Sequence, residues 1–468
     1  MRVDLLPTRY NQPGDPLEKK QTGLLAGSAI FFISSLIIYT ARFATSIIVA
    51  RTIGVEGKGI YTLVLMVGSL LVLFLSLGLS GSFTYFTASQ RFDPASLYAF
   101  SLSASLGISL IGGIAFYVLY ISYLDSTFLA GISPQYILLV LILLPFNLIS
   151  LFLSGIILGK QQLVAYNLIN ILRVGSNLIF QITSAISGGG LPGAILAWVA
   201  SNLVAFFTTL WFVRGDFRLS LRFSPQIARP AASYGIKNYF ANLFQFFNYR
   251  LDSFLVNFYK GAGDVGLYST GVGVAELIWY IPNAISSALF PKSSAMSKET
   301  SSRLTAQVCR QSLVVATLLA IGSAVVGPLL IPFFYGIDFL PSVKPFLWLL
   351  PGILGITLSK IISANLAGIG KPQYATYASG LAVLITVALD VLLIPPYGIT
   401  GAAIASSIAY LTTALLTVMW FSRETHIRWV DIFLPRKDDF ILLANRSMQL
   451  ISSTWLLLSD RLSRFKPG

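Results

Sequence analysis

Long apolar stretches that recur along almost the whole chain constrain its fold more than any other feature. Each has about 20 residues or more, the length that a helix needs to cross a ~30 Å hydrocarbon core. Because no water reaches the backbone there, the backbone must satisfy its own hydrogen bonds, and a helix does so within one segment. We predict an all-α membrane protein of about 12 transmembrane helices. The expected spans cover residues 24–50, 60–86, 97–124, 136–158, 163–186, 192–213, 234–259, 265–290, 308–334, 345–369, 374–394 and 399–421.

The distribution of charge predicts how the chain lies in its membrane. Only 11% of the 468 residues are charged, against about 25% in an average soluble domain. If the N-terminus is cytoplasmic, 24 of the 32 Lys and Arg residues fall in cytoplasmic segments. The positive-inside rule then predicts a multi-pass membrane protein with both termini cytoplasmic. The net charge of +14 suits anionic lipid headgroups, and we expect no nucleic-acid partner.

The chain has one cysteine, Cys309, and one histidine, His426. A disulfide needs a pair of cysteines, and a zinc site needs a cluster of ligands. A hydrolase that uses a histidine base would depend on His426, which follows the last predicted span. We therefore expect no metal, no cofactor and no enzymatic activity.

An internal repeat divides the chain into two halves. Three blocks recur in the same order at offsets of 207, 211 and 208 residues: Gly54, Gly59 and Tyr61 as Gly261, Gly266 and Tyr268; Gly159, Lys160 and Tyr166 as Gly370, Lys371 and Tyr377; Gly193, Ala194 and Ala197 as Gly401, Ala402 and Ala405. Six helices per half give both halves the same orientation, a pattern typical of transporters with a site between the halves. We expect an N-terminal tail (1–22), an N-lobe (23–213), a cytoplasmic linker (214–233), a C-lobe (234–421) and a C-terminal tail (422–468).

Polar residues line one face of the first helix in each predicted lobe. The residues, at spacings of three, four or seven, are Ser28, Ser35, Tyr39, Arg42 and Ser46 in the first lobe, and Asn238, Asn242, Gln245, Tyr249 and Asp252 in the second. At the repeat offset of 208, Arg42 corresponds to Arg250. Ionisable groups inside spans indicate functional sites, and a guanidinium binds two oxygens of a phosphate at once. These stripes predict a cationic cavity between the lobes.

Other roles for the buried charges are open at this stage. Arg250 could pair with a carboxylate for packing, and Arg42 could reach a headgroup. Asp252 could neutralise Arg250 or bind a coupling ion. Arg173 could be a cavity ligand or an ion-pair partner, and Lys360 could mirror it in the second lobe. Glu276 is a candidate for proton coupling, and Asp390, near the outer end of its span, suits a structural role.

The chain beyond residue 440 predicts an amphipathic helix in the cytoplasmic interface. Its apolar face comprises Ile441, Met448, Ile451, Trp455 and Leu458. The alternative, a thirteenth span, would place Arg446 in the membrane and the basic C-terminus outside.

Five segments resemble bacterial polysaccharide-biosynthesis membrane proteins: FNYRLDSFLV (247–256), VGLYS (265–269), ALFPK (288–292), GVEGKGIY (54–61) and LLIPPYGITGAA (392–403). These are the Wzx-type flippases of the MOP superfamily, which also contains lipid II flippases and MATE drug exporters. The resemblance implies a two-lobe, alternating-access transporter that moves a polyprenyl-diphosphate-linked glycan across a bacterial or archaeal cytoplasmic membrane. In such a protein Arg42 and Arg250 would face the diphosphate. It further implies membrane lipids and glycan polymerase or assembly proteins as partners, a monomer, and coupling to a Na⁺ gradient, an H⁺ gradient or the membrane potential.

Two rival functions differ from this reading. A MATE-type exporter of drugs or metabolites shares the fold, but typical cationic substrates favour an acidic cavity. A membrane glycan polymerase or ligase usually needs a large outer loop with catalytic residues, and every predicted outer loop here is short.

Overall fold

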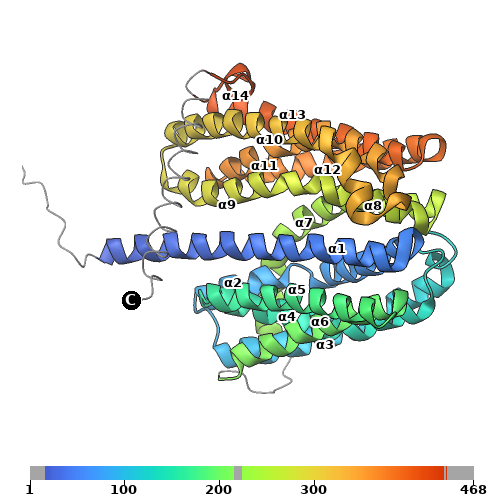
Figure 1. Cartoon of the computed structure of the whole chain (residues 1–468). Coiled ribbons are helices and arrows are strands. Elements are labelled where there is room, and N and C mark those ends of the chain that lie inside the picture. Colours follow the sequence, from blue (N-terminus) through green and yellow to red (C-terminus); the bar gives the residue numbers. More distant parts are fainter. Residues whose placement is uncertain (1–15, 216–223, 437–438, 440–468) are drawn as a thin grey trace, which may run out of the picture.

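The computed structural model describes residues 16–215, 224–436 and 439, with side chains described from residue 34 onward except those of residues 237 and 238. This part of the chain is almost entirely helical and contains no strand, so the predicted all-α class is confirmed (Figure 1). The helices are α1 (Pro16–Ser76), α2 (Leu79–Ala88), α3 (Pro94–Leu119), α4 (Pro134–Gly159), α5 (Leu163–Ile186), α6 (Gly190–Val213), α7 (Pro225–Lys260), α8 (Ala262–Ala275), α9 (Tyr280–Ala295), α10 (Lys298–Tyr335), α11 (Val343–Gly368), α12 (Gln373–Tyr397), α13 (Ile399–Thr425) and α14 (Val430–Phe433).

Three short irregular turns connect or extend these helices. A π-helical turn, η1 (Tyr120–Leu124), continues α3, and a 3₁₀ turn, η3 (Ile337–Ser342), leads into α11. A second 3₁₀ turn, η2 (Glu276–Trp279), separates α8 from α9 within one long apolar segment. Short 3₁₀ stretches inside helices often mark a functional hinge.

Ten helical segments of the described chain are long and apolar enough to cross a membrane. One of them is the 43-residue segment Ser34–Ser76, which is too long for a single crossing. The polar helix α7 is not among the ten, although its 36 residues exceed the required length. Counting α1 as two crossings and α7 as one gives 12, so the expected number agrees with the helix lengths and stays a prediction.

A glycine bends the chain at the same place in each half of the repeat. Within α1, Gly54 has φ 69° and ψ −171°, and Gly261, between α7 and α8, has φ 88° and ψ 175°. A side chain with a Cβ atom rarely adopts this conformation, whereas glycine does so at little cost. Two positions that the repeat relates therefore carry the same backbone bend.

The two groups of helices lie on opposite sides of the molecule, with α1–α6 on one side and α8–α13 on the other (Figure 1). Near the glycine bends they touch through a reciprocal contact of α1 with α8. A Cβ atom on Gly59 would overlap the carbonyl oxygen of Ala262, and one on Gly266 would overlap the carbonyl oxygen of Val55. Because the repeat relates Gly59 to Gly266 and Val55 to Ala262, the contact has the self-complementary form of a twofold interface.

The chain after α13 folds back onto the helices of the second half. Ile432 is fully buried in a cluster with Leu366 and Phe421. Arg310 on α10 donates through Nε to the Asp439 carboxylate at 2.6 Å and through Nη1 to the Asp431 carbonyl at 2.5 Å. The predicted amphipathic helix beyond residue 440 lies outside the described residues.

Candidate functional site

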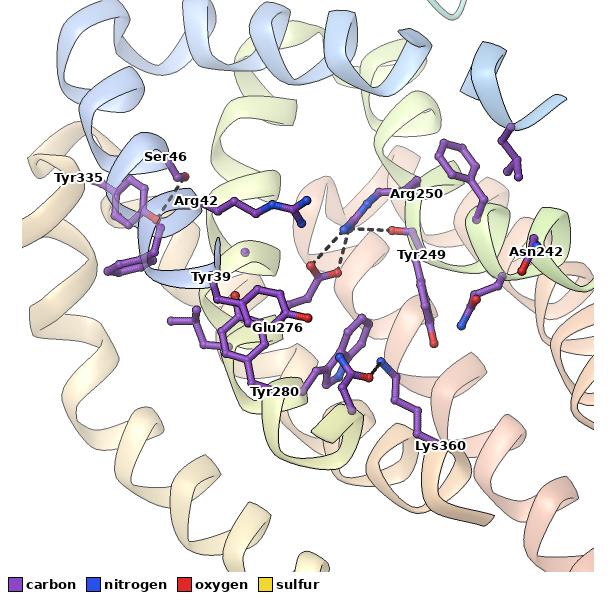
Figure 2. Close-up of a pocket in the computed structure, with 18 residues that line it drawn as sticks. Tyr39, Arg42, Ser46, Asn242, Tyr249, Arg250, Glu276, Tyr280, Tyr335 and Lys360 are labelled. Carbon is purple, nitrogen blue, oxygen red and sulfur yellow. Dashed lines mark hydrogen bonds and ion pairs between the residues drawn. The ribbon is translucent and has the colours of Figure 1, made fainter. Parts of the chain in front are cut away.

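A cavity of about 650 Å³ lies between α1 on one side and α7, η2, α9, α10 and α11 on the other (Figure 2). Its polar and charged lining residues include several that the sequence singles out, namely Arg42, Ser46, Asn242, Gln245, Arg250, Glu276 and Lys360. Asn283, which the sequence analysis does not name, also lines it. Arg42 and Arg250 thus line one cavity, from the first helix of each predicted lobe.

Helical periodicity places these side chains on the cavity wall. Residues three, four or seven apart share one face of a helix. On α1 this face carries Tyr39, Arg42 and Ser46 into the cavity. On α7 the wall is formed by Asn242, Gln245, Phe246, Tyr249 and Arg250.

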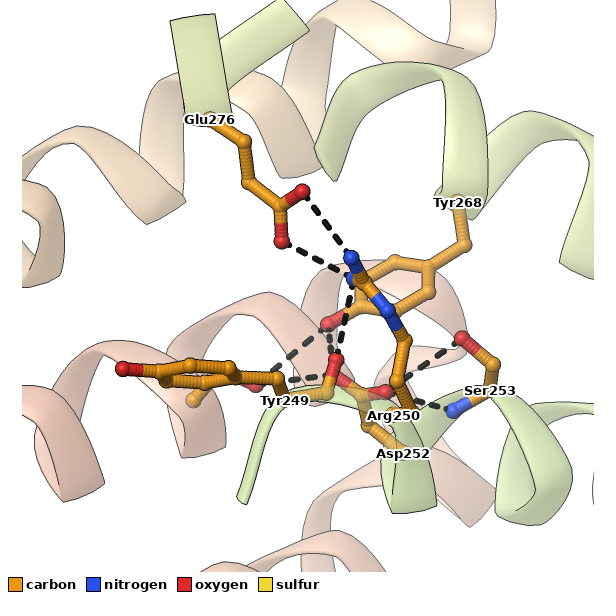
Figure 3. Close-up of polar contacts among 7 residues, drawn as sticks. Tyr249, Arg250, Asp252, Ser253, Tyr268 and Glu276 are labelled. Carbon is orange, nitrogen blue, oxygen red and sulfur yellow. Dashed lines mark hydrogen bonds and ion pairs between the residues drawn. The ribbon is translucent and has the colours of Figure 1, made fainter. Parts of the chain in front are cut away.

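Arg250 forms a bidentate ion pair with Glu276. Nη1 donates to Oε1 at 2.8 Å and Nη2 donates to Oε2 at 3.0 Å (Figure 3). Nη1 also donates to the Tyr249 carbonyl at 3.1 Å. Of the two roles open for Arg250, the structure therefore places it both on the cavity wall and in an ion pair, and its partner is Glu276 rather than Asp252.

The other cations of the region have no carboxylate partner within the described part of the chain. Arg42 points toward Arg250 across the cavity and forms no hydrogen bond or ion pair there (Figure 2). Lys360 donates to Asn283 Oδ1 at 2.8 Å and lies over the Trp279 ring at 4.3 Å. Arg173, on α5, donates to Asn170 at 3.1 Å and is not among the cavity-lining residues, although its charge interacts with that of Arg42.

Aromatic rings form much of the remaining wall. Tyr39 on α1 and Tyr280 on α9 stack with their centroids 3.7 Å apart, across the division between the two groups of helices. Tyr249 packs beside Trp279 with a centroid distance of 4.9 Å. Flat faces next to amide and charged groups suit a ligand that has both apolar and polar surfaces.

A smaller cavity of about 260 Å³ shares Ser46, Arg250 and Glu276 with the first. It is also lined by Lys58, which falls in the loop predicted between the spans 24–50 and 60–86. Instead, Lys58 belongs to α1 and is only 4% exposed. Its Nζ donates to Ser46 Oγ at 2.7 Å and lies 4.9 Å from the centre of the Tyr335 ring. Because α1 continues past Gly54, this lysine faces inward.

Asp252 on α7 and Asp390 on α12 are not among the residues that line either cavity. Asp252 Oδ2 accepts hydrogen bonds from Tyr268 at 2.5 Å and Ser406 at 3.0 Å, as Figure 3 shows in part. Asp390 is fully buried, and neither of its carboxylate oxygens has a hydrogen-bond partner among the described residues. Its position at the outer end of a span suggested contact with water, whereas the packing of α12 against α7 and α13 encloses it.

Neither the cavity lining nor the surroundings of Asp252 and Asp390 form a cluster of transition-metal ligands among the described residues. The described residues contain no group of three or more His, Cys, Asp or Glu side chains that could hold a metal ion. Cys309 is buried and unpaired in the described structure.

More than half of the chain matches a known protein family. A family model described as "Polysaccharide biosynthesis protein" matches residues 48–344. The chain belongs to this polysaccharide biosynthesis protein family. The match includes all of α2–α9 and most of the residues that line each of the two cavities, so the family assignment covers most of the candidate site.

Individual relatives agree with the family. The chain is 24% identical over 80% of its length to a protein of Shigella flexneri named as an O-antigen transporter, of which it covers 92%. It is also 24% identical over 59% of its length to a protein of Haloferax volcanii named as a probable low-salt glycan biosynthesis flippase. That alignment covers 61% of the Haloferax protein.

Two solved structures define the fold. The lipid II flippase MurJ in an inward closed conformation matches 95% of this chain and 94% of its own, with a TM-score of 0.68 and 17% identity. An inward-facing MATE multidrug transporter of the MOP superfamily matches 83% of this chain and 94% of its own, with a TM-score of 0.62 and 18% identity. This member of the polysaccharide biosynthesis family therefore has the MurJ- and MATE-like fold that the sequence resemblance implies.

Proposed function

We propose that the chain is an alternating-access flippase that moves a polyprenyl-diphosphate-linked oligosaccharide across the cytoplasmic membrane. The observation that carries the proposal is the cavity between the two groups of helices, where Arg42 and Arg250 face each other and Lys360 adds a third cation. Glu276 is the one carboxylate among the described lining residues. The cavity wall thus has an excess of positive charge, as a diphosphate requires.

The depth of the two arginines supports this role. Arg42 precedes the bend at Gly54 by 12 residues and Arg250 precedes Gly261 by 11. At a rise of 1.5 Å per residue this corresponds to about 17 Å of helix, or roughly half of a ~30 Å hydrocarbon core. Transporters built from repeats bind their substrates near this midplane. The names of the Shigella and Haloferax relatives, a transporter of O-antigen and a glycan flippase, favour a glycan substrate.

An exporter of cationic drugs is the competing function within the same fold. The charge of the cavity argues against it, because Arg42, Arg250 and Lys360 would repel a cation and Glu276 is already paired with Arg250. Transport rather than glycan polymerisation also agrees with the names of the relatives. We further propose a monomer with both termini in the cytoplasm that receives its lipid-linked substrate from glycan assembly proteins.

A second part of the proposal concerns the energy source. Asp252 on α7 and Asp390 on α12 are both buried in helices that pack against each other, and Thr386 Oγ1 of α12 lies 3.4 Å from Asn248 Oδ1 of α7. Neither oxygen of Asp390 has a hydrogen-bond partner among the described residues, and a buried carboxylate without partners is costly. We propose that Asp390, with Asp252, takes up Na⁺ or H⁺ and that this binding couples transport to the ion gradient. Carboxylate oxygens suit a hard cation.

The test of the main proposal replaces the two arginines one at a time. Arg42→Ala and Arg250→Ala are expected to abolish display of surface glycan in cells while the amount of protein in the membrane stays unchanged. The control is Arg303→Ala, which removes an arginine that is 77% exposed and pairs with Glu299 away from the cavity. Normal glycan display in both cavity variants contradicts the proposal.

A further inference from the structure

The two terminal nitrogens of Arg250 are not available to a ligand in this structure, because both of them already bind Glu276. Both terminal nitrogens donate to the Glu276 carboxylate, at 2.8 and 3.0 Å, in the geometry with which arginine binds a phosphate. Arg42, on the opposite wall, carries no such partner among the described residues. The two facing arginines are therefore in different states, one without a carboxylate partner there and one already neutralised.

The pair is placed where it can exchange partners. The Arg250 and Glu276 side chains are 32% and 20% exposed, and both line the two cavities. Removing one partner of a fully buried pair is costly, since the other charge is left without solvent. A pair at a cavity wall loses much less, because water or an incoming anion replaces the lost partner.

The backbone at Glu276 also differs from that of its neighbours. Glu276 begins η2, the 3₁₀ turn that interrupts the helix between α8 and α9, whereas Arg250 lies within the uninterrupted helix α7. A 3₁₀ turn has poorer hydrogen-bond geometry than an α-helix. The carboxylate therefore belongs to the more adaptable of the two elements, and the guanidinium to the fixed one.

We propose that Glu276 is an internal competitor for Arg250 that the substrate diphosphate displaces. An arriving diphosphate first meets Arg42, then exchanges with Glu276 on Arg250, so that both arginines hold it. On release, Glu276 recaptures Arg250 and lowers the affinity of the emptied site. Transport needs this because a substrate that is bound too tightly is not released. This inference rests on the proposed function and assigns Glu276 a role in substrate release at the same cavity.

The test measures binding and transport of the same variants. The probe is farnesyl diphosphate, bound to the purified full-length chain in detergent, with farnesol as the neutral control ligand. Glu276→Gln keeps the shape of the side chain and removes its charge. We expect its affinity for farnesyl diphosphate to rise at least about tenfold, or about 1.4 kcal/mol, with unchanged affinity for farnesol, while its transport rate falls. Glu276→Asp keeps the charge and shortens the reach, so its affinity should lie between those of the wild type and Glu276→Gln.

The control variant is Glu424→Gln, which removes the same charge from a carboxylate that pairs with Lys298 and Lys371 rather than with a cavity residue. It should leave the affinity unchanged. Equal or weaker binding of farnesyl diphosphate by Glu276→Gln overturns the competitor role. If Glu276→Gln does not fold, an affinity of Glu276→Asp equal to that of the wild type overturns it instead. Failure of the proposed function itself would give a different result: Arg42→Ala would bind farnesyl diphosphate as tightly as the wild type does.

Discussion

At the scale of single residues, the candidate site is a set of charges whose partners determine their roles. Arg42 has no carboxylate partner within the described residues, whereas Arg250 is paired with Glu276. Lys360 donates a hydrogen bond to Asn283 and lies over the Trp279 ring. Asp390 is the opposite case, a carboxylate that is fully enclosed and receives no hydrogen bond from the described residues. A carboxylate enclosed in this way is costly unless a proton or a cation neutralises it.

Asp390 provides the residue-scale prediction. Asp390→Asn removes the ionisable group but leaves the cavity untouched, so binding of farnesyl diphosphate should persist while transport loses its dependence on an imposed Na⁺ or H⁺ gradient. The measurement is transport in proteoliposomes with and without each gradient. Asp338→Asn, which changes an exposed carboxylate of η3, is the control. Gradient-dependent transport by Asp390→Asn at the wild-type rate contradicts the coupling role.

The sequence predicts the members of this site better than their pairings. Periodicity groups Arg42 with Ser46 on one face of α1 and Asn242 with Gln245 on one face of α7, because residues on one helical face stay together whatever packs against them. The internal repeat, which favours a site between the halves, predicts that these two faces meet. The partner of Arg250 depends on how α7 packs against η2, which no local pattern contains. Lys58 escapes prediction for a related reason: the bend at Gly54 resembles a loop in the sequence, although the helix continues directly after it.

At the scale of elements, the contact of α1 with α8 holds the two groups of helices together near the glycine bends. Thr62 Oγ1 and Ser269 Oγ lie 3.4 Å apart beside it, and Arg51 donates to the carbonyl oxygens of Phe333 and Phe334 at the end of α10. The closely packed glycines leave no room for a side chain at Gly59. This end of the cavity is therefore closed by backbone contact, and alternating access requires these elements to part.

Enlarging Gly59 should open this contact. In Gly59→Val the added side chain overlaps the backbone of α8, so a cysteine introduced as Thr62→Cys should react faster with a membrane-impermeant thiol reagent. The native Cys309 is buried and gives a low background. Gly263→Val is the control, because a Cβ atom at Gly263 meets nothing within 4 Å. If the introduced cysteine reacts equally fast in Gly59→Val and in Gly263→Val, the contact of α1 with α8 does not close the cavity.

A second element-scale prediction concerns the segment after α13. The Arg310 and Asp439 side chains are 8% and 2% exposed, and removing one partner of a buried pair costs about 3–5 kcal/mol. Arg310→Ala should lower the stability of the purified protein by this order, read as a fall in its unfolding temperature. Arg428→Ala, which breaks an ion pair whose arginine is 78% exposed, should change it little. An equal effect of the two variants contradicts the anchoring role.

The same pair has a defined pH dependence. Burial by itself raises the pKa of Asp439, but hydrogen bonds from Arg310 and from the Arg436 amide outweigh it and lower the pKa below its usual value. The stabilisation is therefore complete above the unfolded pKa of about 3.9 and is lost as the pH falls through the lower folded pKa. The stability difference between wild type and Arg310→Ala should be constant near neutral pH and shrink below about pH 4.

At the scale of the whole molecule, duplication explains both the fold and the site. The repeat places a glycine bend after the first helix of each half, reciprocal glycines at the contact of the halves, and an arginine from each half in one cavity. Apolar length and an internal repeat are properties of the chain that packing cannot alter, so the all-α class with two halves could be predicted. The MurJ- and MATE-like fold was implied by the resemblance of short segments to a known family. The break at η2 could not, because it lies inside one long apolar segment without glycine or proline at residues 276–279.

The most direct test is movement of lipid-linked glycan by the purified chain in proteoliposomes. A fluorescent polyprenyl-diphosphate oligosaccharide is placed in both leaflets, and a membrane-impermeant quencher reports the fraction that reaches the outer leaflet. The wild type should make almost all of the probe accessible, while Arg42→Ala should leave accessible only the outer half, as in liposomes without protein. Equal accessibility with wild type and with empty liposomes, or full accessibility with Arg42→Ala, would contradict a flippase that works through this cavity.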